Sequence, residues 1–146
     1  MFPFDSYPSQ GRVLLGPVSG DRCRRGYGLK FMQKTGQTAC AYCGVDFAAS
    51  YQDWLNMTLD HVVPVNVCRD LRISDDWMED CANKVLACSA CNGFNNRYKP
   101  SEDIAIPQSL AGFFDLRDRI FTERKRLVTA SHEREREFFA RRLWQL

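Results

Sequence analysis

The sequence of 146 residues contains no uninterrupted apolar run that approaches the length of a membrane-spanning helix. Its first residues also lack a basic stretch followed by an apolar one, so we expect no signal peptide. There is no low-complexity tract and no internal repeat apart from two short cysteine motifs. These absences predict a cytoplasmic protein without membrane association. The length suits one small core with a helical extension.

The chain also lacks a strong charge of either sign, since its formal net charge is +2. Basic residues nevertheless gather in residues 12–34 and 117–142, whereas acidic residues gather between the cysteine motifs. Basic flanks of this kind can contact nucleic-acid phosphates, although solvated helix faces give the same pattern. The candidate phosphate contacts are Arg22, Arg24, Arg25, Arg97 and Lys99.

Cysteine is the residue type present in excess, with seven in a short chain. The odd number, the paired spacing and the missing signal sequence favour metal thiolates over disulfides. Four of the cysteines form two Cys-x-x-Cys motifs, Cys40 with Cys43 and Cys88 with Cys91. Two such pairs supply the tetrahedral ligand set of structural Zn²⁺ and leave no ligand position open for catalysis.

Three cysteines remain outside these motifs. We interpret Cys23, Cys68 and Cys81 as buried or free thiols, because an unpaired cysteine behaves as a small apolar residue. Cys81 is the alternative ligand, since it lies one short segment before Cys88. The second histidine, His132, lies in a charged run, where we expect it to be exposed and without a chemical role.

The pair Asp60-His61 lies between the two motifs, and Asn92 directly follows the second. Adjacent side chains on a strand point to opposite faces, so Asp60 and His61 can share a site only where the strand ends. A carboxylate and an amide oxygen bind hard divalent cations, and a neutral imidazole can take a proton from water. In the alternative interpretation, Asp60 is a surface acid, His61 a core histidine and Asn92 a helix cap.

Three other polar residues bear on this site. Asn95 and Asn96 lie on the same helical face as Asn92 and can assist or replace it. Asn83 precedes the second predicted strand, where it can hold the preceding loop through backbone hydrogen bonds.

The local patterns predict an α+β fold. We expect an irregular N-terminal arm with a short strand at 13–15, a helical turn at 48–55, and strands at 57–63 and 84–87. A long loop should cover 65–81, pinned by Trp77 and Met78, and a helix capped by Ser89 should cover 89–98. Apolar residues at three- and four-residue steps after Pro107 predict one long helix, or two helices broken near Ser131.

The combined motifs resemble the HNH, or ββα-metal, endonuclease family in its zinc-stapled form. The resemblance covers residues 36–99 and rests on the two cysteine pairs, Asp60-His61-x-x-Pro64, Asn83 and Asn92. It implies that His61 is the general base, that Asp60 and Asn92 hold a catalytic Mg²⁺ or Mn²⁺, and that Asn83 shapes the loop. Many members have histidine where Asn92 stands, and often lysine where Asn95 stands.

The resemblance implies a DNA endonuclease that leaves a 5′ phosphate and a 3′ hydroxyl. We therefore predict a basic N-terminal arm at 1–35, a ββα-metal nuclease core with a zinc site at 36–100 and a helical extension at 101–146. The alternative function is a non-catalytic zinc module that binds nucleic acid or protein; RNA is a lesser alternative as substrate, because no aromatic stacking signature is present.

Overall fold

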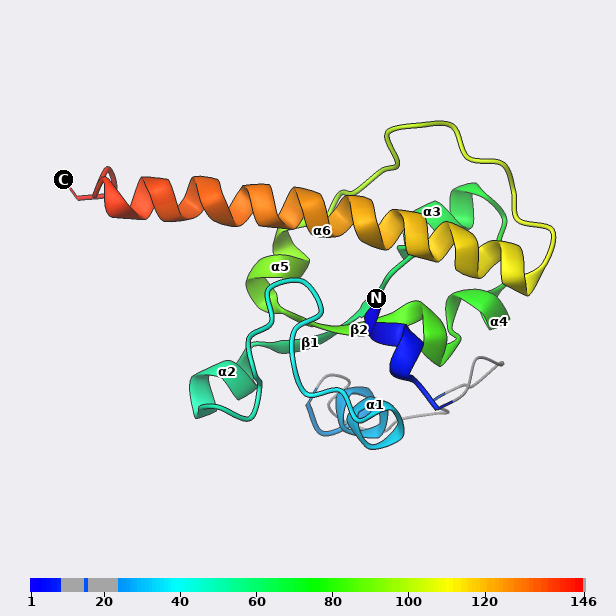
Figure 1. Cartoon of the computed structure of the whole chain (residues 1–146), viewed down its shortest axis with the longest axis horizontal. Helices are drawn as coiled ribbons and strands as arrows, with labels where there is room; N and C mark the ends of the chain where they lie inside the picture. Colours follow the sequence, from blue (N-terminus) through cyan, green and yellow to red (C-terminus); the bar gives the residue numbers. More distant parts are fainter. Residues whose placement is uncertain (9–14, 16–23, 146) are drawn as a thin grey trace.

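The computed structural model of the chain describes residues 1–8, 15 and 24–145. Two antiparallel strands, β1 (Met57–His61) and β2 (Lys84–Cys88), form its sheet, with register running from Met57 opposite Cys88 to His61 opposite Lys84. Helices surround this hairpin, and the long helix α6 (Leu110–Ala140) crosses it (Figure 1). The α+β prediction is therefore confirmed. Among the described residues, none of the helices has both the length and the apolar character required to cross a membrane.

The strands predicted at 57–63 and 84–87 are confirmed, although β1 already ends at His61, and β2 is buried along its whole length. The predicted helical turn near residue 50 is α2 (Tyr51–Leu55), whose first turn is capped by Ser50 through a hydrogen bond from the Asp53 amide. Helix α5 (Ser89–Phe94) follows β2 directly but is shorter than predicted. Its N-cap is Cys88 rather than Ser89, because the Cys88 sulfur accepts a hydrogen bond from the Cys91 amide.

The segment 65–81 differs from its prediction as a loop. It contains α3 (Val65–Asp70) and α4 (Asp75–Met78), followed by the 3₁₀ turn η2 (Cys81–Asn83). The Ser74 hydroxyl caps α4. Each helix has only one or two turns, too few for a periodic apolar pattern to stand out in the sequence. Trp77 and Met78 do pack against the core, as expected.

The N-terminal segment is less irregular than predicted. It contains the 3₁₀ turn η1 (Pro3–Ser6) and helix α1 (Tyr27–Thr35), which ends at Gly36 with a φ of +72°. Glycine adopts this left-handed conformation without steric cost. Of the strand predicted at 13–15, only Leu15 is described, and it is buried outside any strand; the rest lies outside the described residues.

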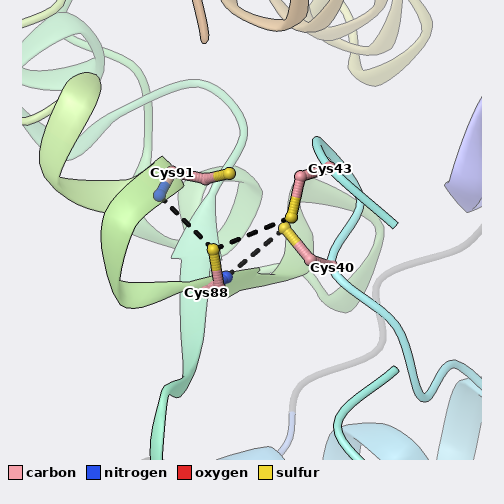
Figure 2. A group of neighbouring side chains, drawn as sticks. All are labelled: Cys40, Cys43, Cys88 and Cys91. Atoms are coloured by element: carbon pink, nitrogen blue, oxygen red, sulfur yellow. Dashed lines mark hydrogen bonds between the residues drawn. The ribbon is translucent and has the colours of Figure 1, made fainter. Parts of the chain in front are cut away.

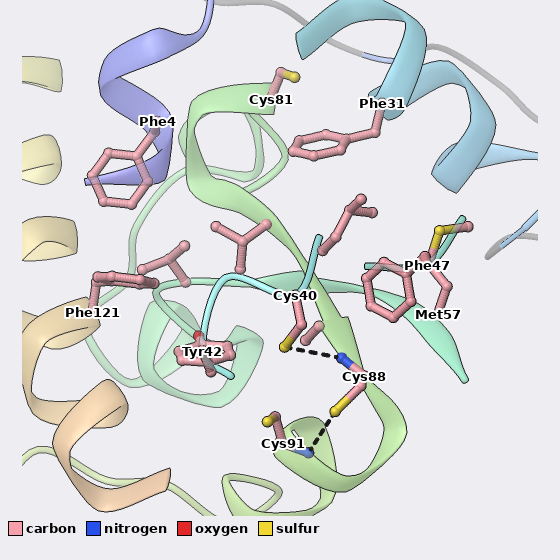
Figure 3. Packing of buried hydrophobic residues seen from close by; sticks show 14 of the residues in the cluster. Phe4, Phe31, Cys40, Tyr42, Phe47, Met57, Cys81, Cys88, Cys91 and Phe121 are labelled. Carbon is pink, nitrogen blue, oxygen red and sulfur yellow. Dashed lines mark hydrogen bonds between the residues drawn. The ribbon is translucent and has the colours of Figure 1, made fainter. Parts of the chain in front are cut away.

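Helix α6 is a single helix, without a break near Ser131. Ser109 caps it by accepting a hydrogen bond from the Gly112 amide. Its buried face divides between two apolar clusters. One joins Phe121 to Phe4 and Phe31 (Figure 3), and it includes the hairpin residue Val85. The other joins Phe113, Leu116 and Ile120 to α3 and α4. The core is thus built from all three parts of the chain.

Candidate metal centre and adjoining polar site

Cys40, Cys43, Cys88 and Cys91 converge on one point, with their four sulfur atoms all within 4.8 Å of one another (Figure 2). The Sγ atoms of Cys43 and Cys88 are 3.8 Å apart. A tetrahedron with metal–sulfur bonds of about 2.3 Å has edges of about 3.8 Å, so the spacing fits zinc thiolate geometry. These cysteines can therefore hold one metal ion, and the donor set is consistent with structural zinc.

Backbone geometry explains why the thiols converge. The turn after Cys40 closes through a hydrogen bond from the Gly44 amide to the Cys40 carbonyl, and Gly44 adopts a φ of +80°. The Ala41 amide donates to the Leu86 carbonyl, which docks this turn on β2. The Cys88 amide donates to Cys40 Sγ at 3.4 Å, an interaction that stabilises a thiolate.

The pKa values of the thiols are consistent with a cation site. Hydrogen bonds from Cys88 and Cys91 lower the pKa of Cys40, which favours its thiolate form. Burial raises the pKa of Cys43 to about 11, and hydrogen bonding to Cys40 and Cys88 raises the pKa of Cys91. Several buried thiolates cannot coexist without a neutralising charge, so a divalent cation would replace the protons of Cys43 and Cys91.

The three other cysteines take no part in this group where the structure describes them. Cys68 and Cys81 are buried free thiols, as predicted, and Cys81 packs in the core beside Phe4 and Phe31 (Figure 3). Burial raises the pKa of Cys81 to about 11, which makes it inert at neutral pH. Cys23 lies outside the described residues.

The prediction that His132 is exposed is wrong. It is half-buried on α6, its Nε2 lies 3.0 Å from Cys91 Sγ, and its ring meets Phe94 edge-on. Once a cation replaced the proton of Cys91, its sulfur would be an acceptor, and the imidazole is placed to donate an N–H to it. No local sequence pattern indicates this contact, because 41 residues separate the two side chains.

Asp60 is nearly buried, with 12% of its side chain exposed, and it faces α6. Its Oδ2 atom lies 2.9 Å from Nη2 of Arg124 and accepts a hydrogen bond from the Tyr42 hydroxyl at 3.2 Å. Burial raises the pKa of Asp60, and the charge of Arg124 offsets part of that effect. Arg124 also donates to the carbonyls of His61 and Val62, which fixes the end of β1.

Asn92 lies on the same face of the hairpin as Asp60. Its Nδ2 donates to the hydroxyl of Thr58 at 3.1 Å, and Thr58 precedes Asp60 by two positions on β1. Side chains two positions apart on a strand share a face. Within the described residues, the hydrogen bonds of the two side chains leave Oδ1 of Asp60 and Oδ1 of Asn92 without a protein donor. Two oxygen atoms suited to a hard cation are therefore held on one face.

His61 is the last residue of β1, and its side chain contacts a different set of residues from Asp60, although the two side chains were expected to share one site. Its Nε2 is 3.0 Å from Oε1 of Glu79, whose other oxygen pairs with the buried ammonium of Lys84 at 2.8 Å. Burial would raise the pKa of Glu79, but the hydrogen bonds and charges of Lys84 and His61 lower it overall. Glu79 is thus an acceptor, which places the imidazole proton on Nε2 and leaves Nδ1 basic.

Asn83 makes the backbone hydrogen bonds expected of it. Its Oδ1 accepts from the Val63 amide, and its Nδ2 donates to the carbonyls of Val63 and Met78. Asn83 is fully buried, so these bonds hold the start of the 65–81 segment against the start of β2. Its part is positional: it fixes the backbone that follows His61.

The predicted phosphate contacts lie at the surface where they are described. Arg25, Arg97 and Lys99 are exposed, and Arg24 is half-buried with a hydrogen bond to the Leu55 carbonyl. Arg22 lies outside the described residues. Of the other candidates, Asn96 is exposed, whereas Asn95 is buried with its Nδ2 unpaired.

Sequence reasoning missed Tyr42, Glu79 and Arg124, which contact the predicted site residues from elsewhere in the chain. Only their position in the fold reveals them, because none belongs to a spaced motif that includes Asp60 or His61.

Comparisons of the chain with protein-family models, with curated proteins and with solved structures found no match.

Proposed function

We propose that the protein is a metal-dependent DNA endonuclease of the HNH type. The observation that carries this proposal is the shared face of Asp60 and Asn92, where each side chain is held by neighbours and keeps one oxygen available. A carboxylate and an amide oxygen fit a hard cation such as Mg²⁺ or Mn²⁺. When bound, such a cation would offset the charge that develops on a scissile phosphate.

In this proposal His61 removes a proton from the attacking water. Glu79 holds the Nε2–H of the imidazole, so Nδ1 is the atom that accepts the proton. Lys84 keeps Glu79 ionised and therefore oriented. The zinc held by the four cysteines is structural, since four thiolates close its coordination shell. It would fix α5, which carries Asn92, against the turn at 40–43 and the end of β2.

The test is incubation of supercoiled plasmid with the purified protein, with and without added Mg²⁺ or Mn²⁺. We expect nicked or linear product only when the cation is added. Omission is preferable to chelation, because a chelator would also compete for the zinc. His61→Ala should lower the rate by roughly 10² to 10⁴, the usual contribution of a general base.

Asn92→Ala should also abolish most cleavage, because it removes one proposed cation ligand. The matched control is Asn96→Ala, which alters an exposed asparagine one turn away on the same segment and should leave the rate unchanged. Cleavage that persists at the wild-type rate in both His61→Ala and Asn92→Ala would rule out the proposed site. Zinc content of each variant should remain near one ion per chain.

One observation favours the alternative of a non-catalytic zinc module. The pair between Asp60 and Arg124 already neutralises the carboxylate in a nearly buried position, as a structural ion pair would. The plasmid assay separates the two functions, since the module would show no cleavage with any divalent cation and would still bind zinc.

A further inference from the structure

The side-chain amide of Asn92 can bind a cation only through its oxygen, because its nitrogen carries protons and does not accept. The two ends of an amide are nearly equal in size, so packing alone does not select the end that faces the cation. The half-buried Asn92 contacts a group that does distinguish them, since its Nδ2 lies 3.1 Å from Oγ1 of Thr58. The polarity of that contact therefore determines whether Oδ1 is available.

The hydroxyl of Thr58 has a single proton, which it donates elsewhere. Its Oγ1 donates to the carbonyl of Ala87 at 2.7 Å, and Ala87 lies directly opposite Thr58 in the hairpin. A hydroxyl donates once, so Oγ1 presents a lone pair to Asn92. The nitrogen of the amide pairs with this lone pair, whereas a rotated amide would set Oδ1 against it with no proton between the two oxygens.

The first turn of α5 is attached to β1 at the same place. The amide and the hydroxyl of Ser89 donate to the carbonyl of Asn56 at 2.8 and 3.2 Å, and Asn56 directly precedes β1. Asn92 follows Ser89 by three residues on this short helix. The position of the Asn92 backbone and the orientation of its amide are thus both set from β1.

We propose that Thr58 is a positioning residue for the cation site, and that the chain from the Ala87 carbonyl through the Thr58 hydroxyl to Asn92 Nδ2 holds Asn92 Oδ1 toward the cation shared with Asp60. Thr58 itself touches neither the cation nor DNA. The inference rests on the proposed function, because that proposal supplies the cation. Without the hydroxyl, the amide populates both orientations, and the affinity for the cation falls with the fraction that can bind.

The first test is the Mn²⁺ affinity of the full-length, zinc-loaded protein without DNA, followed by the electron paramagnetic resonance signal of free Mn²⁺. Thr58→Val keeps the shape of the side chain and suits a strand, so thermal unfolding should change little. We expect it to weaken Mn²⁺ binding by roughly tenfold, since loss of an outer-shell partner costs about 10- to 100-fold. Thr58→Ser keeps the hydroxyl and should bind as the wild type does.

The matched control is Thr122→Val. It removes an exposed threonine hydroxyl that also donates to a backbone carbonyl, that of Asp118, but does so within α6. The Mn²⁺ affinity of this variant should equal that of the wild type.

The second test separates orientation of the amide from general support of the fold. Asn92→Asp replaces the amide by a carboxylate, whose two oxygens are equivalent and both bind cations. In this background the Thr58 lone pair faces an oxygen in either orientation, so adding Thr58→Val should cost no Mn²⁺ affinity. A residue that only supported the fold would cost the same factor in both backgrounds.

Unchanged Mn²⁺ affinity in Thr58→Val, or the same loss with Asn92 and with Asn92→Asp, would overturn the proposal. In the plasmid assay, Thr58→Val should raise the half-saturating Mg²⁺ concentration, and saturating Mg²⁺ should restore most of the rate. A wild type that binds Mn²⁺ without cleaving DNA would refute the nuclease function alone, since the affinities of the variants still decide the role of Thr58. A wild type that binds no Mn²⁺ would overturn both.

Discussion

Arg124 is the residue on which most contacts near the candidate site depend. It is 2% exposed, pairs with Asp60, and donates to two successive carbonyls at the end of β1. Its guanidinium also lies over the rings of Tyr42 and Tyr98. One side chain of α6 thus fixes both the carboxylate and the backbone from which His61 projects.

Replacement of Arg124 by Ala should lower the free energy of unfolding by about 3 to 5 kcal/mol, because it leaves Asp60 buried without a counter-charge. Urea denaturation of the zinc-loaded protein measures this change. Arg126→Ala is the matched control, since this arginine of the same helix is exposed and should cost little. Equal stability of the two variants would mean that the ion pair does not support the fold.

At the scale of elements, the candidate metal centre joins two segments that are distant in the sequence. The turn at 40–43 and the junction of β2 with α5 supply the sulfur atoms, and α6 adds the contact from His132 to Cys91. A hydrogen bond to a ligand of a metal orients that ligand. The metal would therefore connect the hairpin to the long helix.

His132→Ala should weaken zinc binding by roughly 10- to 100-fold, the usual cost of losing an outer-shell partner of a metal ligand. Competition against a chromophoric chelator measures the affinity, and the absorption of the Co²⁺-substituted protein reports whether four sulfur ligands remain. His61→Ala is the control, since His61 contacts Glu79 rather than a cysteine. Equal zinc affinities in the two variants would show that the contact with Cys91 has no influence on the metal.

Short-range patterns predicted the cysteine pairs, both strands and the long helix, because each rests on spacing within a few residues. The short helices α3 and α4 were missed because they have too few turns to show a periodic apolar pattern. They are defined instead by the cap at Ser74 and by the burial of Val67 and Met78. The partners of Asp60 and His61 were missed because they come from other elements. The Asn83 hydrogen bonds were predicted, since they involve segments that flank one loop.

For the whole molecule, the core draws on segments from both ends of the sequence. One apolar cluster contains Phe4 and Phe31 from the N-terminal segment together with Phe121 and Val128 from α6. Arg117 lies between the rings of Phe4 and Phe114 and donates to the Ala82 carbonyl. The segments before and after the hairpin therefore contribute to one core.

A fragment of residues 36–100 should not fold alone, even with zinc, because it loses the aromatic residues that cover β2 and the arginine that pairs with Asp60. We expect a two-dimensional amide NMR spectrum with narrow dispersion, whereas the full chain with zinc should give a dispersed one. A chain shortened after Arg134 keeps all fully buried residues of α6 and is the matched control. A dispersed spectrum from the 36–100 fragment would show that the predicted nuclease core is an autonomous domain.

The sequence by itself determined the four cysteines that can hold a metal ion and the order of the strands and the long helix, because these depend on residue type and close spacing. It singled out Asp60, His61 and Asn92 by their residue types but not by their arrangement. Only the tertiary structure decided which charges those residues meet. Arg124, Glu79 and His132 reach them across 18 to 64 positions of sequence, and a contact over such a distance exists only after the chain has packed.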